Sequence, residues 1–477
     1  MAVLPGCDRP ESVETGSVAE APKPATGVTL RVRVIGDPTL ADAFMRYQGE
    51  WAARFGGQLK VERSQPGEDL ADDHPPADVL IYPASRMGTL AEHDRLMAVR
   101  KGVLRGEAYQ ANDIFPLVRQ CTARWGDREL AMPLGAPVLV LIYRADLFAR
   151  MGLAPPETWT AYGRLLEKLS DPAAGDAAGD REANGSMADP PWIAAVEPTS
   201  GVWAAHLLLA RAAPYAKPAD QYSTLFDMET MEPLIDRPPF VRALSELRQA
   251  YQSVRWPRLD PTGAREALLT GRTAMAITWL SAARPHATVT ADTALAVVPL
   301  PGSKRVFRSR SGEWASRDAG RNGRVPYVGF AGRVGSVSRS CRNAPTAFRF
   351  LAWAGSTEMS SRICAASPAT TLFRYSQSGS AGAWVDPGLS TKTVTDYAHA
   401  VEDQLVRTNA LTALRIPAAD QYLAALAEGV RRVLDDRQPP EQSLTSVADQ
   451  WRKITADRGI DRQKLAYQKN LGLGNGN

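Results

Sequence analysis

An alternation of strand and helix patterns near the start of the chain is the feature that most constrains its fold. Residues 28–34 carry an apolar side chain at every second position, which is the period of a strand, and Gly36-Asp37-Pro38 ends the run. Residues 40–55 repeat large apolar side chains every three or four positions, which predicts a helix. Two further strand patterns follow, QLKVERS and the nearly continuous ADVLIYPAS. This order predicts an α/β fold with parallel strands and right-handed crossovers.

The length and the composition predict two lobes with hydrophobic cores. A chain of 477 residues exceeds what one compact core usually holds. Its 44% hydrophobic and 23% charged residues are typical of globular proteins. The net charge of +4 comes without a long Lys/Arg block, which disfavours a dedicated nucleic-acid binder. The sequence contains no apolar run that approaches the length of a membrane-spanning helix.

The cysteines and histidines give no support for a metal site, and we expect no cofactor. The four cysteines contain no CxxC pair, and the five histidines are scattered. With Cys7 set aside, three cysteines remain: Cys121, Cys341 and Cys364. Two of them can form one disulfide, and Cys341–Cys364 is the most plausible pair. Three buried free thiols are about as plausible. No Ser/His/Asp, Cys/His or paired-carboxylate arrangement stands out, and we do not expect an enzyme.

Several segments, in a fixed order, resemble the bacterial extracellular solute-binding proteins of ABC importers. The carbohydrate-type branch of that family, which includes maltose-binding protein, is the most similar. The closest match is residues 128–169, where a proline turn and an apolar strand ending in Tyr and a basic residue precede DLFARMGLAPPETW. Residues 196–209 (VEPTSGVWAAHLLL), 266–280 (EALLTGRTAMAITWL) and 296–302 (AVVPLPG) add looser matches. The ordered set covers nearly the whole chain from Val28.

The resemblance implies a type II periplasmic-binding-protein fold. This fold has two lobes, each a mixed sheet flanked by helices, joined by two or three hinge crossings. We place the crossings near Leu134–Val138, Ala296–Pro301 and Ser338–Asn343. The expected lobes are an N-terminal one of residues 28–136 plus 299–341, and a C-terminal one of residues 137–298 plus 342–477.

The resemblance also implies a function. We expect a monomeric substrate-binding component of an ABC transporter that closes its lobes on a small polar solute, a sugar or oligosaccharide, and delivers it to the permease. A periplasmic sensor or scaffold with the same clamshell fold is the alternative, and a two-lobed hydrolase is a third hypothesis. Neighbouring permease genes favour the importer, and a neighbouring sensor kinase favours the alternative.

A sugar needs aromatic rings for its C–H face and hydrogen-bonding groups for its hydroxyl rim. The resemblance places Trp203 and Trp279 at positions where relatives stack a ring on the ligand. Trp279 is the strongest candidate, because Thr-Trp at a strand end beside Ser281 is unusual in a core. For each candidate, a core or surface role is the competing interpretation. The expected ligand-binding residues are Tyr82, Ser85, Glu197, Trp203, Trp279, Tyr327, Phe330, Arg374 and Tyr422.

The first residues resemble a lipoprotein signal. Leu4-Pro5-Gly6-Cys7 is similar to the lipobox after which the cysteine becomes the lipidated first residue. Residues 8–27 are rich in Pro, Glu, Ala and Gly, which indicates a flexible tether. We therefore expect residues 1–27 to be a signal remnant and tether, with lipidation at Cys7 and anchoring in the periplasm or at the cell surface. A chance match is the alternative.

Residues 302–324 contain seven basic side chains among Gly and Ser. Contact with anionic lipid or with the transporter is one interpretation. A solvated, mobile loop is the interpretation we favour.

Overall fold

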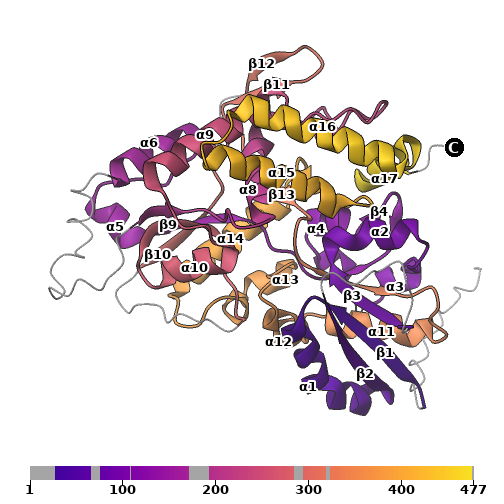
Figure 1. Ribbon diagram of the computed structural model, residues 1–477. Coiled ribbons are helices and arrows are strands. Elements are labelled where there is room, and N and C mark those ends of the chain that lie inside the picture. Colours follow the sequence, from indigo (N-terminus) through magenta and orange to yellow (C-terminus); the bar gives the residue numbers. More distant parts are fainter. Residues whose placement is uncertain are drawn as a thin grey trace, which may run out of the picture.

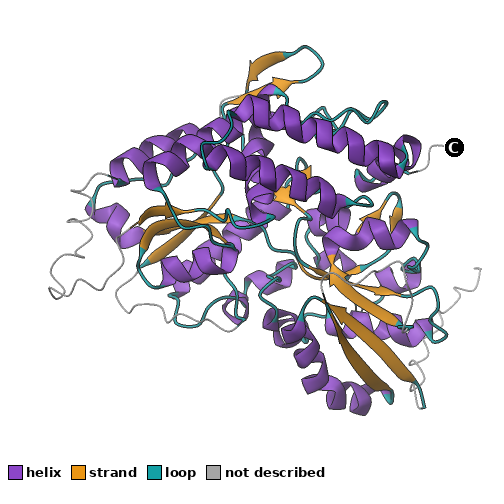
Figure 2. Cartoon of the chain, viewed as in Figure 1, coloured by secondary structure: helices purple, strands orange, loops and turns teal. Residues whose placement is uncertain are grey.

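The computed structural model describes residues 27–65, 76–107, 109–170, 193–283, 294–317 and 323–474. Two separate β-sheets, each covered by helices, divide these residues into two lobes (Figures 1 and 2). The α/β class and the two-lobed arrangement predicted from the sequence are confirmed. Cys7 and the tether lie outside the described residues.

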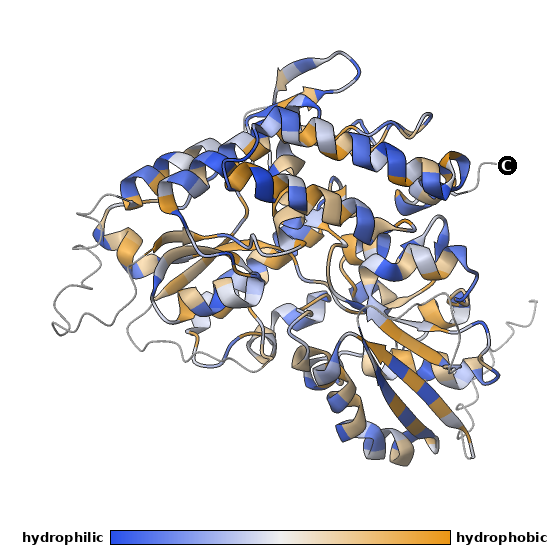
Figure 3. Cartoon of the chain, in the orientation of Figure 1, coloured by the Kyte–Doolittle hydropathy of each residue, from blue (hydrophilic) through white to orange (hydrophobic). Residues whose placement is uncertain are grey.

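The first lobe contains a five-stranded sheet in the order β2-β1-β3-β14-β6. Its strands are β1 (Thr29–Ile35), β2 (Gln58–Ser64), β3 (Val79–Pro83), β6 (Met132–Gly135) and β14 (Arg333–Val337). The first three strands are parallel, and β14 runs antiparallel to both of its neighbours. Hydropathy alternates along β1 and β2 (Figure 3), although residues 32–35 of β1 are all buried.

Helix α1 (Pro38–Phe55) connects β1 to β2, as the alternation predicted. Asp37 caps its first turn by accepting a hydrogen bond from the Leu40 amide (3.1 Å). Gly56 ends the helix in the left-handed conformation, with φ at +77°. The local sequence signals therefore fix the bounds of this helix.

The second lobe contains a four-stranded sheet in the order β10-β7-β9-β8. Its strands are β7 (Val140–Arg144), β8 (Ile193–Val196), β9 (Thr273–Thr278) and β10 (Leu295–Pro299). Only β8 and β9 are parallel to each other. The helices that pack on this sheet are α5 (Ala145–Arg150), α6 (Trp159–Leu169), α9 (Pro238–Val254), α10 (Pro261–Leu269) and α14 (Thr391–Leu405). Helix α8 (Trp203–Ala216) packs on α9.

The chain after β14 stays with the first lobe for longer than expected. Helix α11 (Ala344–Ala354) packs on β14 and β6, and α12 (Ser360–Ile363) packs on α1. Phe350 and Trp353 of α11 contact Trp51 of α1, with ring centroids 5.5 Å apart in each pair. The crossing predicted near Ser338–Asn343, and with it the assignment of residues 344–363 to the C-terminal lobe, is therefore wrong.

The basic segment forms a β-hairpin rather than a loop. Strands β11 (Arg305–Arg308) and β12 (Glu313–Ser316) pair antiparallel and project from the second lobe (Figure 1). Phe307 contacts Trp314 across the hairpin (5.4 Å), and Trp314 contacts Tyr215 of α8 (6.1 Å). These aromatic contacts correct the solvated-loop interpretation for residues 305–316 and attach them to the second lobe. The crossing predicted near Ala296–Pro301, and with it the assignment of residues 305–316 to the N-terminal lobe, is therefore wrong. Residues 318–322 lie outside the described residues.

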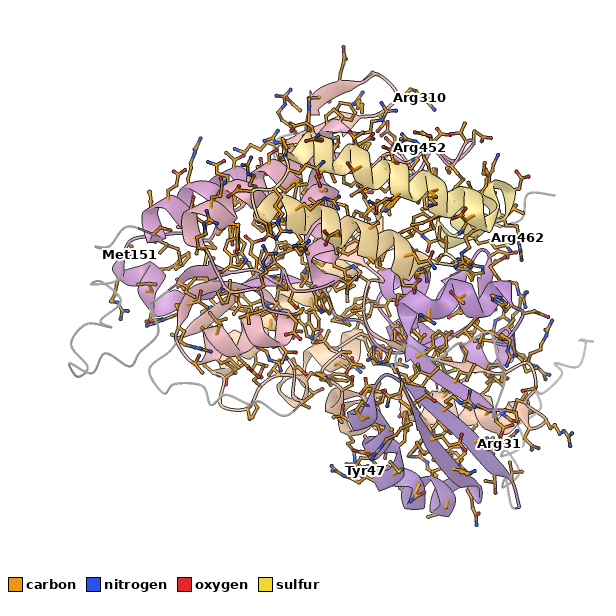
Figure 4. The ribbon with its side chains drawn as sticks, in the orientation of Figure 1. Arg31, Tyr47, Met151, Arg310, Arg452 and Arg462 are labelled. Atoms are coloured by element: carbon orange, nitrogen blue, oxygen red, sulfur yellow. The ribbon has the colours of Figure 1, made fainter. Side chains whose placement is uncertain are left out.

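Three C-terminal helices cross from one lobe to the other. They are α15 (Ala419–Leu434), α16 (Pro440–Arg458) and α17 (Ile460–Asn470). Helices α15 and α16 pack on α8 and α9 of the second lobe, whereas α17 packs on α2 (Met87–Glu92) of the first. Figure 4 labels Arg452 on α16 and Arg462 on α17. Lys469 pairs with Glu92 at the far end (2.9 Å).

The three described cysteines, Cys121, Cys341 and Cys364, are free and buried. The Cys341–Cys364 disulfide is therefore not formed, and the alternative of three buried thiols is the one that the structure has. In the described part of the chain, no group of three or more His, Cys, Asp or Glu side chains is placed to hold a metal ion. No helix in the described ranges has both the length and the hydropathy that crossing a membrane requires.

Candidate functional site

The carboxyl ends of strands from both lobes meet around one cavity of about 490 Å³. In the first lobe, β3 ends at Pro83 and leads directly into Ser85, and Arg333 at the start of β14 lies opposite Pro83. In the second lobe, β9 leads into Trp279. Strand β8 is parallel to β9, so the residues that follow it, including Trp203, reach the same edge. Ligand sites of α/β sheets form at such edges.

Three aromatic rings form one wall of this cavity. Trp203 is the first residue of α8, Trp279 follows β9, and Phe330 lies just before β14. The Trp203 ring centroid is 5.6 Å from that of Trp279 and 6.2 Å from that of Phe330. The centroids of Trp279 and Phe330 are 6.4 Å apart. Such a wall packs well against the apolar face of a ring or chain that carries hydroxyl groups on its edges.

Buried neighbours hold the aromatic wall in place. Tyr327 stacks on Phe330 with ring centroids 5.1 Å apart and planes at 8°. The Tyr327 hydroxyl lies 3.0 Å from Nδ1 of His206, which itself lines the cavity. Burial lowers the pKa of His206 to about 4, so this imidazole is neutral near pH 7. The wall therefore presents no charge from His206 to a ligand.

Trp279 links the two lobes. Its Nε1 donates a hydrogen bond to the Pro368 carbonyl (3.0 Å). The segment that contains Pro368 is attached to the first lobe, because the Ser367 hydroxyl donates to Asp37 Oδ2 (2.5 Å) at the end of β1. The indole orientation is therefore fixed by a group from the opposite side of the cavity.

Polar side chains complete the lining, and sequence reasoning missed most of them. Asp260 caps α10, since its Oδ1 accepts from the Gly263 amide (2.8 Å), and Arg333 is paired with Asp37 (2.8 Å). Sequence signals were available: Arg86 directly follows the candidate Ser85, and Asp260-Pro261 is a helix-start signature. The polar side chains around the cavity are Ser85, Arg86, Thr89, His206, Asp260, Thr262, Arg333 and Asp420.

Four of the nine side chains predicted from the sequence line this cavity: Ser85, Trp203, Trp279 and Phe330. The other five do not line it, and each has its polar atoms bonded within the protein. Tyr327 supports the wall from behind. The Tyr82 hydroxyl lies 2.8 Å from Ser336 Oγ, and the Tyr422 hydroxyl lies 2.8 Å from Thr455 Oγ1.

Glu197 and Arg374 are structural in this fold. Glu197 is 0% exposed, and its two carboxylate oxygens accept from Arg211 Nη1 at 2.8 and 2.7 Å, while the Tyr162 hydroxyl donates at 3.0 Å. The Arg374 guanidinium is also buried and donates to the carbonyls of Gly355 (2.9 Å) and Tyr109 (2.9 Å). The placement of both among the ligand contacts is therefore corrected, because their hydrogen-bonding groups already have partners away from the cavity.

Comparisons with known proteins agree with the two-lobed fold. The family model of bacterial extracellular solute-binding proteins matches residues 25–360. An ABC transporter solute-binding protein from Agrobacterium radiobacter K84, solved with ribitol, is 20% identical, with a TM-score of 0.68 over 91% of this chain and 100% of that one. A protein from Agrobacterium vitis S4 with bound D-mannitol is 15% identical (TM-score 0.62; 90% and 99% covered). The sugar-binding protein MalE from Xanthomonas citri is 17% identical (TM-score 0.65; 90% and 98% covered). No curated protein matches the chain.

Proposed function

We propose a function from one premise: the chain belongs to the bacterial extracellular solute-binding protein family. It is a solute-binding protein of the ABC-transporter type, and membership of an extracellular family implies a periplasmic or surface location. Our proposal is that its solute is a sugar or a polyol, bound in the cavity between the lobes. In this proposal the protein binds and releases its solute without making or breaking a bond.

The observation that carries the proposal is the aromatic wall in a cavity lined by both lobes. Trp203, Trp279 and Phe330 offer apolar faces, and Ser85 and Thr89 offer hydroxyl groups from the opposite lobe. A polyhydroxylated carbon skeleton needs both kinds of contact at once. The ribitol and D-mannitol in the similar structures are ligands of the same chemistry.

A ligand that touches both walls stabilises the arrangement in which the walls are close. The equilibrium between open and closed lobes then shifts toward the closed form. The size of this shift is set by how much more tightly the ligand binds the closed form than the open form. Phe330 lies on the connection between the lobes, directly after Gly329 (φ +77°) and two residues before Gly332 (φ +104°). Ring contact with a ligand therefore acts at the connection itself.

We further propose that the permease subunits recognise the closed form and that Cys7 carries the lipid anchor. Cys7 lies outside the described residues, and its assignment rests on the Leu-Pro-Gly-Cys sequence. Labelled palmitate should be incorporated when the gene is expressed in a bacterium with its upstream region. Label that survives Cys7→Ala, or no label at all, would contradict the anchor.

The function is tested by a thermal-shift screen of the purified protein against sugars and polyols, followed by calorimetry. A solute that binds the native state should raise the Tm, and the rise should grow with solute concentration. The proposal fails if no sugar or polyol shifts the Tm. It also fails if the protein turns over a glycoside and a single carboxylate substitution abolishes the turnover.

A further inference from the structure

Arg86 has an unusual position among the residues of the cavity. It ends the short 3₁₀ turn Ala84–Arg86 that follows β3, and its side chain lines the cavity beside Ser85. Its Nε atom is shielded from solvent and has no hydrogen-bond partner. Within the described residues, no carboxylate pairs with this guanidinium.

The other arginine of this cavity has partners for its guanidinium. Arg333 lines the same cavity, and it is paired with Asp37 (2.8 Å) and donates to the Gly36 carbonyl (3.1 Å). The buried Arg374 and Arg415 donate to oxygen atoms of neighbouring segments. A shielded donor without an acceptor costs about 1–3 kcal/mol, and more when it is charged. Because Arg86 lines the cavity, an acceptor group of a ligand can supply the partner that this guanidinium lacks.

The two carboxylates of the cavity do not serve this role. Asp260, which directly precedes α10, and Asp420 of α15 are exposed residues of the cavity lining. Asp260 also uses one oxygen to cap α10. Their charges are solvated, whereas the Nε of Arg86 is not.

We propose that the natural ligand is an acidic carbohydrate, a sugar or polyol with a carboxylate or a phosphate, and that Arg86 binds its acidic group. This inference rests on the proposed function. The planar guanidinium presents parallel N–H groups that match two oxygens of a carboxylate or phosphate. A neutral hydroxyl accepts from one N–H and leaves the positive charge uncompensated. The aromatic wall packs against the C–H face of the same ligand.

Calorimetry with matched ligands tests the proposal. One set is D-glucose, D-glucuronate and D-glucose 6-phosphate. The second set is D-galactose, D-galacturonate and D-galactose 6-phosphate, and the third is D-mannitol, D-mannonate and D-mannitol 1-phosphate. We expect an acidic form to bind the wild-type protein at least tenfold more tightly than its neutral counterpart. The carboxylate and phosphate arms then identify the acidic group.

Variants separate charge recognition from cavity shape. Arg86→Gln should weaken binding of the acidic form at least tenfold more than it weakens binding of the neutral form. Arg86→Lys should fall between, because it keeps the charge and loses the fork. Arg100→Gln, at an exposed arginine of the same lobe, is the matched control and should change neither affinity.

Two outcomes overturn the acidic ligand and leave the proposed function intact. The first is wild-type protein that binds neutral forms as tightly as acidic ones or more tightly. The second is an equal loss of both affinities in Arg86→Gln, which would mean that Arg86 only shapes the cavity. Binding of no carbohydrate in the panel would overturn the proposed function, and the inference with it.

Discussion

At the scale of single residues, identical sequence signatures lead to different roles. Tyr82 and Trp279 both stand at the end of an apolar strand. Trp279 lines the cavity, whereas the Tyr82 hydroxyl meets Ser336 of β14, which is 254 residues away in the sequence. No local pattern contains that partner. The sequence could therefore predict which residues sit at strand ends, but not which of them remain open to a ligand.

Trp279 should contribute strongly to solute binding. Trp279→Ala removes one of the three rings of the aromatic wall and the hydrogen bond to Pro368. We expect the Kd of the solute found by the screen to rise at least about tenfold. Calorimetry measures this change. Trp314→Ala, in the hairpin outside the cavity, is the control and should leave the Kd unchanged; equal Kd values for wild type and Trp279→Ala would exclude the ring from the site.

Glu197 should matter for stability and not for binding. Glu197→Gln leaves Arg211 buried without its counter-charge, so we expect the free energy of unfolding to fall by about 3–5 kcal/mol. Glu358→Gln breaks the exposed pair with Arg54 and should cost at most about 1 kcal/mol. Urea denaturation measures both, and calorimetry should find unchanged solute affinity in any folded Glu197→Gln protein. If Glu197→Gln lost solute affinity but kept its free energy of unfolding, Glu197 would be a ligand-binding residue after all.

His206 should make stability fall in mild acid. Its folded-state pKa of about 4 lies below the ordinary value of 6.5, so the unfolded state binds the proton first as the pH falls. No penalty exists above pH 6.5, and it grows down to about pH 4. Between pH 7 and 5 the penalty amounts to about 2 kcal/mol.

The measurement compares urea denaturation of wild type and His206→Gln at pH 7 and pH 5. The wild type should lose about 2 kcal/mol more than the variant over this interval. Equal losses in the two proteins would show that His206 titrates normally in the folded state.

At the scale of elements, local sequence patterns correctly predicted the helices and strands that are formed by segments adjacent in the sequence. The segment β1–α1–β2 follows from a period of two, a period of three to four, and two capping signals. The hairpin β11–β12 was missed because Arg, Ser and Gly surround its few aromatic residues, whose partner Tyr215 lies on α8. Helix α11 was assigned to the wrong lobe because its apolar face fits either sheet by pattern alone.

Gly332 should tolerate no side chain. A Cβ there would lie 2.4 Å from the Gly135 carbonyl oxygen, in a backbone with φ at +104°. Since the clash is with backbone of the other connection, Gly332→Ala should lower the free energy of unfolding by about 1–3 kcal/mol or more. Gly163→Ala, in the open middle of α6, should instead add about 0.5–1 kcal/mol. Thermal denaturation distinguishes the two; a neutral Gly332→Ala would contradict the tight contact between the connections.

At the scale of the whole molecule, both lobes line the cavity, and helices α15, α16 and α17 cross from one lobe to the other. Solute binding should draw the two lobes together. We expect the radius of gyration from small-angle X-ray scattering to decrease when saturating solute is added to wild-type protein. Trp279→Ala at the same solute concentration should remain more extended, and a wild-type radius that does not respond to solute would argue against closure.

The strand order of the first lobe also has a consequence for synthesis. Strand β14 separates β3 from β6, so the first sheet is complete only once residue 337 has been made. The second sheet needs nothing beyond residue 299. On the ribosome, the downstream lobe can thus finish its sheet while the upstream one still has two open strand edges. The sheet of the lobe that is translated second is thus the first to have all of its strands.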